Sequence, residues 1–188
     1  MKTFTLLFTF AILSLTAVAQ KNFPQKLQFS IGADIGLPTS GIKESHSFML
    51  GASAQAGINL AKPLQLTANI GFLNFFGKTV TYNLQDAPSY ATSSDLQVLP
   101  IKAGLRYFLE PNFYIQGDAG VAIILNRADL SYAHSSAFTY SPQMGVLFSA
   151  GAKNFIDLGI RYQATGKYDA EDTASKYSFL GLRVAYGF

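Results

Sequence analysis

The last residues of the chain alternate strictly between large apolar residues and small or polar ones, and they end in an aromatic residue. Within the segment 178–188, one set of alternate positions is apolar: Leu180, Leu182, Val184, Tyr186 and Phe188. The positions between them carry Gly181, Arg183, Ala185 and Gly187. Successive side chains of a β-strand point to opposite faces, so this segment predicts a strand with one apolar and one small or charged face. Such a strand suits a barrel whose outer surface contacts lipid.

The same alternation recurs in seven further segments of the chain. They are residues 27–37, 48–60, 64–76, 96–109, 113–125, 143–152 and 155–164. Most of them have the roughly ten residues that a tilted strand needs to cross a bilayer. No apolar run after residue 19 is long enough for a transmembrane helix. The sequence therefore predicts an all-β fold, an eight-stranded antiparallel transmembrane β-barrel.

The connections between these segments alternate between short and long. Tight turns rich in Pro and Asn are expected at residues 61–63, 110–112 and 153–154. Long polar segments are expected at residues 38–47, 77–95, 126–142 and 165–177. Outer-membrane barrels have short periplasmic turns and longer external loops. This order predicts four external loops and places both termini in the periplasm.

The N-terminus has the features of a cleaved signal peptide. Lys2 supplies a positive charge, residues 4–18 are mostly apolar, and Ala17-Val18-Ala19 gives a cleavage pattern of small residues. We expect cleavage after Ala19, so that residues 1–19 are removed and residues 20–188 form one barrel domain. A membrane anchor is the alternative, but the apolar run is shorter than the roughly 20 residues that a spanning helix needs. No cysteine follows that would accept a lipid.

Composition supports a surface that contacts lipid. Hydrophobic residues make up 49% of the chain and charged residues 13%, about half of the charged fraction usual in soluble domains. The formal net charge of +3 comes without a basic cluster, which argues against nucleic acid as a partner. Because the chain has no cysteine, disulfides cannot stabilise it. A membrane or a large core must therefore do so.

The polar faces of the expected strands separate two kinds of barrel. A secreted lipocalin-like barrel would enclose an apolar cavity and present a polar exterior. The polar faces here combine many glycines with charges of both signs: Asp34, Lys102, Arg106, Asp118, Asp157, Arg161 and Arg183. Small and oppositely charged residues fit a narrow lumen, where they can pair. They can form an ion path or a filled interior, and eight strands leave space only for side chains, which favours filling.

One segment carries a family resemblance. Residues 96–108 read Leu-Gln-Val-Leu-Pro-Ile-Lys-Ala-Gly-Leu-Arg-Tyr-Phe, and the chain ends in Tyr186-Gly187-Phe188. Together with Ala17-Val18-Ala19-Gln20, these residues resemble the PorT-like family of small outer-membrane barrels typical of Bacteroidota. The resemblance implies an eight-stranded outer-membrane barrel and no particular reaction. It also implies that Pro100 is a feature of the fold, although a local bulge at this proline is possible.

Few residues suggest chemistry. The histidines are His46 and His134, and serines lie beside both: Ser45, Ser47, Ser135 and Ser136. A lipid-modifying enzyme would need a Ser–His pair near the lipid boundary, but the sequence has no G-x-S-x-G motif. Three acidic residues close together suggest calcium ligands but lack EF-hand spacing: Asp169, Glu171 and Asp172. We expect no catalytic residue, no cofactor and no metal site.

The function expected by elimination is non-enzymatic. The chain is predicted to serve the outer membrane structurally, or to bind a protein or surface ligand through its external loops. Its other expected partners are outer-membrane lipid and, through the C-terminal strand, the barrel assembly machinery. The alternatives are a narrow pore, or a barrel associated with transport or secretion, and then a lipid-modifying membrane enzyme.

Overall fold

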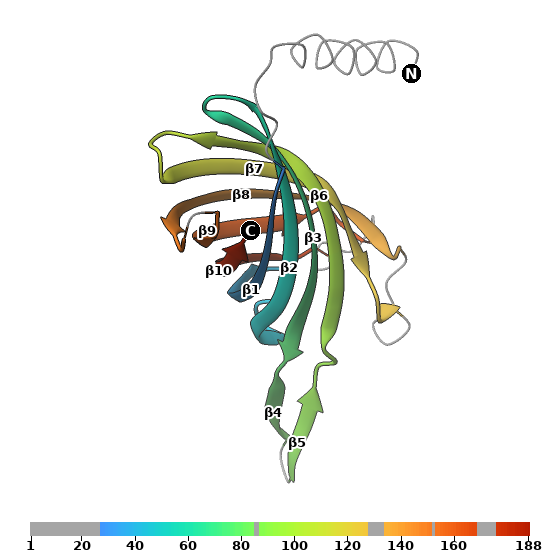
Figure 1. Ribbon diagram of the computed structural model, residues 1–188. Helices are drawn as coiled ribbons and strands as arrows, with labels where there is room; N and C mark the ends of the chain where they lie inside the picture. The colour runs from blue at the N-terminus through green and yellow to red at the C-terminus, as the bar shows by residue number, and fades with distance from the viewer. Residues whose placement is uncertain (1–26, 85–86, 128–133, 152, 169–175) are drawn as a thin grey trace, which may run out of the picture.

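Eight strands of the chain form a closed antiparallel barrel (Figure 1). The computed structural model describes residues 27–84, 87–127, 134–151, 153–168 and 176–188. The order of strands around the barrel is β1-β10-β9-β8-β7-β6-β3-β2. Their bounds are β1 (Leu27–Ser40), β2 (His46–Ala61), β3 (Leu64–Gly77), β6 (Leu96–Phe108), β7 (Phe113–Ile124), β8 (Ser136–Ser149), β9 (Phe155–Thr165) and β10 (Ser178–Gly187). The eight-stranded antiparallel barrel expected from the sequence is confirmed.

The barrel closes where the first strand pairs with the last. β1 and β10 are antiparallel neighbours from Ser30, opposite Gly187, to Ser40, opposite Ser178. Beyond Gly187, Phe29 N donates to Phe188 O at 3.1 Å and Phe188 N donates to Phe29 O at 2.9 Å. Lipid offers no hydrogen-bond partner, so a closed ladder satisfies backbone groups that an open edge would leave unpaired.

The distribution of side chains is the reverse of that in a soluble barrel. Large apolar side chains point outward, as shown by Ile31, which is 61% exposed, while Asp157 and Arg183 point inward and are 0% exposed. Exposed apolar residues occur on all eight barrel strands. This arrangement excludes the lipocalin-like alternative, because such a barrel would expose polar residues and bury apolar ones. Among the described residues, no helix has the length and apolarity needed to cross a membrane.

The two ends of the barrel differ. We call the end that holds residues 62–63, 109–112, 150–151 and 153–154 the turn end, and Leu27 and Phe188 also lie there. The loop end holds the described residues 41–45, 125–127, 134–135, 166–168 and 176–177, together with a hairpin between β3 and β6. The expected short turns are confirmed. The expected long loop at residues 38–47 is wrong, because β1 continues to Ser40 and β2 starts at His46.

The sixth predicted strand is too short. β8 starts at Ser136 rather than at residue 143, so residues 136–142 are strand and not loop. Phe138 and Tyr140 continue the outward apolar series, and Pro142 lies opposite Gly117 of β7. Pro142 lacks a backbone donor, and the β8–β9 ladder has no pair at residues 141 and 142 but resumes in the same register at Gln143. The strand therefore continues through Pro142, although a proline usually indicates the end of a loop at such a position.

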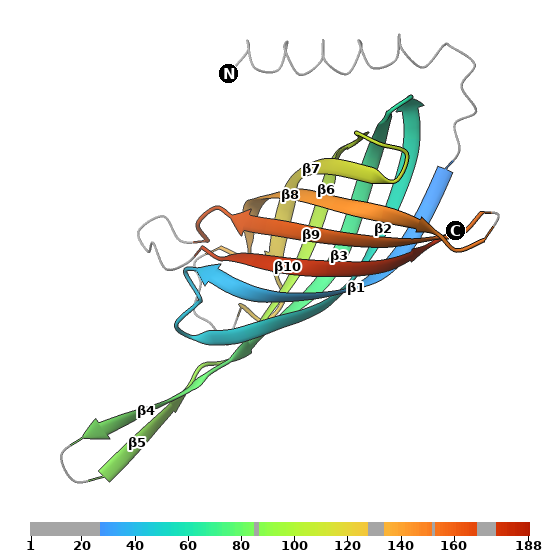
Figure 2. The ribbon, with the colours of Figure 1, turned by 90° about the vertical axis from the view of Figure 1, so that its left-hand side faces the viewer.

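Much of the segment 77–95, expected to be a loop, forms a second β-sheet. β4 (Thr79–Leu84) and β5 (Ala87–Thr92) form an antiparallel hairpin separate from the barrel sheet. Figure 2 shows it projecting from the loop end, well beyond the barrel wall. Each strand has six residues, too few to cross a bilayer, and this is why the segment is not recognised among the spanning strands of the sequence.

Pro100 lies within β6 without a bulge. On one side of it Ile101 pairs with Ile70 of β3, and on the other side Val98 pairs with Leu73, in an unchanged register. The ladder to β3 has no pair at residues 99 and 100. The bulge considered from the sequence is therefore absent, and the missing donor of the proline is accommodated within a regular ladder.

Deleting Phe188 should destabilise the barrel more than removing its ring. The deletion removes both hydrogen bonds between residues 29 and 188, whereas Phe188→Ala keeps them and loses only the ring contact with Phe29, whose centroid is 6.3 Å away. We expect the deletion to cost about 1–3 kcal/mol more than the substitution. Urea unfolding in detergent micelles, followed by the band shift between boiled and unboiled samples, measures this. Equal stability of the two variants would contradict a closing role for this backbone pair.

Candidate functional site

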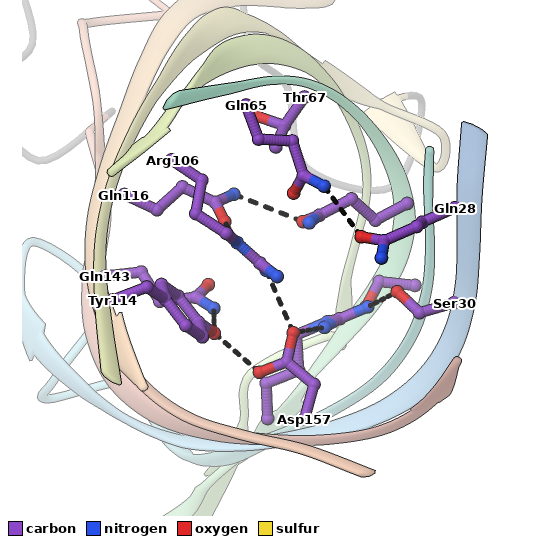
Figure 3. Close-up of polar contacts among 12 residues, drawn as sticks. Gln28, Ser30, Gln65, Thr67, Arg106, Tyr114, Gln116, Gln143 and Asp157 are labelled. Atoms are coloured by element: carbon purple, nitrogen blue, oxygen red, sulfur yellow. Dashed lines mark hydrogen bonds and ion pairs between the residues drawn. The ribbon is translucent and has the colours of Figure 1, made fainter. Parts of the chain in front are cut away.

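Asp157 of β9 is the centre of a polar network that crosses the lumen (Figure 3). Its Oδ2 atom accepts a hydrogen bond from Arg106 Nη2 at 2.9 Å and another from Arg183 Nη1 at 3.2 Å. Its Oδ1 atom accepts a bond from the Tyr114 hydroxyl at 2.6 Å. The donors come from β6, β10 and β7. A single carboxylate therefore links four strands across the interior.

The network extends from Arg106 toward β2 and β3. Arg106 Nε donates to Gln116 Oε1 at 2.7 Å, and Gln116 Nε2 in turn donates to Asp118 Oδ2 at 2.8 Å. Gln116 Nε2 also donates to Gln55 Oε1 at 3.1 Å. The Thr67 hydroxyl donates to Asp118 Oδ1 at 3.0 Å. Asp118 thus accepts hydrogen bonds from neutral donors and has no guanidinium partner among these contacts.

All the charged residues expected in the lumen are found there and are buried. They are Asp34, Asp118, Asp157, Lys102, Arg106, Arg161 and Arg183. Arg161 pairs with Asp34, which gives a second ion pair beside the Asp157 cluster. Because burying an isolated charge is costly, the pairing makes this interior compatible with folding.

Lys102 differs from the three arginines. Its ammonium group donates to Gln163 Oε1 at 2.7 Å, and the ion pairs found among the described residues do not include it. The four cations therefore exceed the three carboxylates of the lumen by one charge. Because no ion pair in the described part of the chain involves Lys102, replacing it is expected to cost less than breaking one of the arginine–aspartate pairs.

Inward glycines make room for the long side chains of the network. A Cβ atom at Gly145 would lie 2.5 Å from the Tyr114 hydroxyl oxygen, and one at Gly57 would lie 2.7 Å from Gln65 Cδ. Gln65 Nε2 donates to Gln28 Oε1 at 2.7 Å near the turn end. Gly145 and Gly57 therefore have a steric role, since a side chain at either position would displace Tyr114 or Gln65.

The loop end of the lumen is apolar, which the sequence analysis did not anticipate. We call the buried cluster there the apolar plug; it consists of Ile42, Met49, Leu73, Phe75, Leu96, Val98, Ala122, Ile124, Ala137, Tyr168, Tyr177 and Phe179. Phe75 lies at its centre, and the centroid of its ring is 5.0 Å from that of Tyr177 and 5.7 Å from that of Phe179. The signal for it was present, because Leu73, Phe75 and Phe179 occupy inward positions of their strands.

Residues beyond the strands complete the apolar plug. Tyr168 and Tyr177 lie in the connection between β9 and β10, and each is 1% exposed. The Tyr168 hydroxyl donates to Ala122 O at 3.2 Å, and the rings of the two tyrosines stack with centroids 6.3 Å apart. Within the described part of the chain, the lumen is thus filled by the polar network in its middle and by the apolar plug at the loop end.

The base of the hairpin is held by a cluster of hydrogen bonds at the loop end. Asp95 Oδ1 accepts from Gly77 N at 2.9 Å, and its Oδ2 accepts from Asn74 Nδ2 at 3.0 Å. Asn126 Nδ2 donates to Asp95 O at 2.7 Å. The Gly77 amide, and then the Asn74 side chain, hold the pKa of Asp95 below its usual value, because both stabilise the carboxylate form.

The structure brings one of the suspected Ser–His pairs together. Ser45 Oγ lies 2.8 Å from His46 Nδ1, and His46 Nε2 lies 3.2 Å from Ser94 O. His46 is the first residue of β2 rather than a loop residue, is 5% exposed, and contacts the Phe75 ring edge-on at 6.5 Å. Both ring nitrogens are occupied, and the imidazole faces the apolar plug. The pair therefore fixes the hairpin base and does not have the exposed geometry of a nucleophile and its base.

The other candidate residues are not brought into a site. His134 is exposed at the loop end, where its backbone N donates to Tyr168 O at 3.0 Å. The suggested calcium ligands fall outside the described residues: Asp169, Glu171 and Asp172. In the described part of the chain, no group of three His, Cys, Asp or Glu side chains is placed to hold a metal ion.

Comparison with known proteins agrees with this geometry. A family model described as outer membrane protein beta-barrel domain matches residues 8–188. The chain belongs to this family. It is an outer-membrane barrel, and no curated protein matches it in a sequence comparison.

Solved structures show the same fold. The barrel is similar to neisserial surface protein A, at 14% identity over 86% of this chain and 95% of that one, with a TM-score of 0.55. It is similar to OprG of Pseudomonas aeruginosa, at 11% identity over 87% and 95% of the two chains, with a TM-score of 0.53. It is also similar to Ail of Yersinia pestis, at 12% identity over 88% and 100%, with a TM-score of 0.50. Likeness at this identity concerns the fold.

Two substitutions in the lumen should have opposite effects on stability. Asp157→Asn removes the charge that pairs with Arg106 and Arg183, and we expect a loss of about 3 kcal/mol because two guanidiniums are left without a carboxylate. Lys102→Met removes the excess cation and should change stability by less than about 1 kcal/mol or raise it. Urea titration of both variants in the same micelles measures the difference. A Lys102→Met variant as unstable as Asp157→Asn would contradict this division of roles.

The filled lumen should not conduct ions. We expect no single-channel steps from the purified barrel in a planar lipid bilayer, because the polar network and the apolar plug both lack an open path. Phe75→Ala combined with Tyr177→Ala should also stay closed, since the network below the plug is intact. An established porin serves as the positive control. Regular current steps from the unaltered protein would contradict a sealed lumen.

Proposed function

We propose that this barrel is a non-enzymatic, non-conducting protein that binds a partner at its loop end. One observation carries the proposal: the lumen is filled with buried side chains, while the β4–β5 hairpin extends beyond the barrel from a base fixed by hydrogen bonds. A filled interior leaves the two ends as the accessible surfaces. The β4–β5 hairpin projects from the loop end (Figure 2), which makes that end the proposed binding surface.

The turn end of the barrel is proposed to face the periplasm. Short connections lie at the turn end together with residues 27 and 188, and in outer-membrane barrels short turns face the periplasm. The turn end is therefore assigned to the periplasm and the hairpin to the cell exterior. Cleavage after Ala19 and recognition of the C-terminal strand by the barrel assembly machinery belong to the same proposal. The resemblance of residues 96–108 to the PorT-like barrels of Bacteroidota supports it.

An enzymatic role is not part of the proposal. A membrane lipase needs its Ser–His pair at the lipid boundary, whereas His46 is buried against Phe75 and its second ring nitrogen is bound to the Ser94 carbonyl. A transport role would need a continuous path through the lumen. The ion pairs of Asp157 and the rings of the apolar plug occupy that path.

Cysteine variants at the two ends test orientation and partner binding together. The chain has no cysteine, so Thr92→Cys on the hairpin and Lys153→Cys at the turn end each introduce a single thiol at an exposed residue. In intact cells a membrane-impermeant thiol reagent should label residue 92 and should label residue 153 only after lysis. A photo-reactive crosslinker attached to the same thiol should then give a discrete adduct in intact cells from residue 92.

The matched positions make the result decisive. Labelling of residue 153 in intact cells would reverse the orientation. Adducts from residue 153 alone would move the binding surface to the periplasm, and the absence of adducts from residue 92 would contradict partner binding through the hairpin. Both outcomes leave the barrel fold unaffected, because both positions lie outside the eight barrel strands.

A further inference from the structure

The hairpin is a two-stranded sheet, so each of its strands has an outer edge. Among the described residues, β4 pairs along its length with β5 and with no other strand. β2, which lies beside β3 within the barrel, begins only at His46, opposite Gly77. The last backbone bond on that side is from Lys78 N to Ser45 O, at 2.7 Å. Beyond Lys78, no described strand occupies the position that β2 would take next to β4.

The ladder shows which backbone groups point to this side. Ser93 N donates to Lys78 O at 3.0 Å, which identifies residues 78 and 93 as a hydrogen-bonded pair. Pairs alternate in an antiparallel ladder, so the next pair, Thr79 opposite Thr92, is non-hydrogen-bonded. Their hydroxyl oxygens are 3.0 Å apart, as the closer side chains of such a pair allow. The same alternation makes Thr81 opposite Tyr90 and Asn83 opposite Pro88 non-hydrogen-bonded.

The two edges of the hairpin are not equivalent. On β4 the outward N–H and C=O groups belong to Thr79, Thr81 and Asn83, an uninterrupted series. On β5 the corresponding series contains Pro88, which has no N–H to donate. Natural proteins protect exposed edges with prolines and charged residues. β5 carries such a proline, and β4 has neither a proline nor a charged residue between positions 79 and 84.

We propose that the outer edge of β4 binds an extended, uncharged strand of a partner protein by adding it to the hairpin as a third strand. This inference rests on the proposed function and specifies its partner. Main-chain hydrogen bonds to residues 79, 81 and 83 provide the binding energy of such strand addition. The absence of charge on β4 favours an uncharged partner strand, since no charge on this edge would compensate a desolvated charge on the partner. The anchored hairpin base lowers the ordering cost of binding.

A second copy of the chain fits this edge less well. Two β4 edges can pair antiparallel only if their barrels point in opposite directions, whereas barrels in one membrane point the same way. Parallel pairing is the remaining arrangement, and it is slightly less stable per residue. A free segment of another protein can approach antiparallel to β4 and continue the position of β2. The edge is therefore assigned to a strand from a different protein.

Hydrogen exchange of the full chain in detergent micelles tests the edge directly. The probe is a capped peptide with the sequence Thr-Val-Thr-Tyr-Asn-Leu, which is uncharged and forms strands readily. At saturating peptide we expect exchange of the edge amides of residues 79, 81 and 83 to slow by about tenfold. The same peptide methylated on alternate backbone nitrogens cannot complete the ladder and should cause no protection.

Two Thr→Pro variants provide the matched comparison. Thr81→Pro removes an outward donor from the β4 edge and should abolish protection by the peptide. Thr92→Pro removes an outward donor from the opposite edge, on β5, and should leave protection intact. Exchange of the β5 amides without peptide verifies that each variant retains the hairpin. If Thr81→Pro does not retain the hairpin, comparison of the two peptides on the unaltered chain still tests whether binding requires backbone hydrogen bonds.

Each remaining outcome overturns the assignment. Strand addition at β4 is excluded if exchange is unchanged at saturating peptide or if both peptides protect equally. It is also excluded if both proline variants lose protection by the peptide equally. Protection that rises with protein concentration in the absence of peptide, and is lost in Thr81→Pro, assigns the edge to a second copy instead. Adducts from residue 92 in intact cells would then still support binding at the loop end, so failure of the edge and failure of the proposed function are distinguishable.

Discussion

The absence of hydrogen-bonding partners in lipid determines most of this structure. Each spanning backbone group must be paired within the protein, so the ladder from β1 must return to β1 through β10. Closing the ladder with eight strands fixes a lumen that only side chains can occupy. All inward side chains must then fit into this one enclosed volume. Asp157 shows how they do so, because its buried carboxylate accepts hydrogen bonds from two guanidiniums and a phenol. Glycines nearby leave the volume that those groups fill.

The filled lumen decides where function can reside. A polar interior by itself suggests a path for ions, but the ion pairs of Asp157 and Asp34 cross the barrel, and the rings around Phe75 close its loop end. The same plug supports the hairpin, since His46 packs on Phe75 and binds the carbonyl of Ser94 at the hairpin base. The interior thus provides rigidity for an exposed element. The proposed binding at the loop end and the filled interior therefore depend on the same packed core.

The sequence predicts those features that depend on a period of two residues. Because a strand's side chains alternate, the pattern of β1 or β10 indicates which residues face lipid and which charges face the lumen, and the structure agrees at every charged lumen residue. The apolar plug escapes this reasoning. Phe179 and Leu73 are inward residues whose apolar character resembles that of the lipid face, and their burial depends on Tyr168 and Tyr177, which reach the lumen from a connection with no periodic pattern. Pro142 misleads for another reason, since its effect depends on a gap in the ladder between β8 and β9, which the sequence of β8 alone does not show.

The hairpin shows how one backbone chemistry has different consequences in two solvents. In lipid an open edge is prohibited, and the barrel has none among its eight strands. In water an open edge is tolerated, because solvent satisfies its N–H and C=O groups, yet it remains able to exchange water for another strand. β5 limits this exchange through Pro88, whereas β4 has no such feature between residues 79 and 84. Since Asp95, Asn74 and Asn126 hold the hairpin base, a strand that binds β4 meets an edge whose base is already ordered. The proposed partner strand would therefore bind an edge that needs little reorganisation at its base.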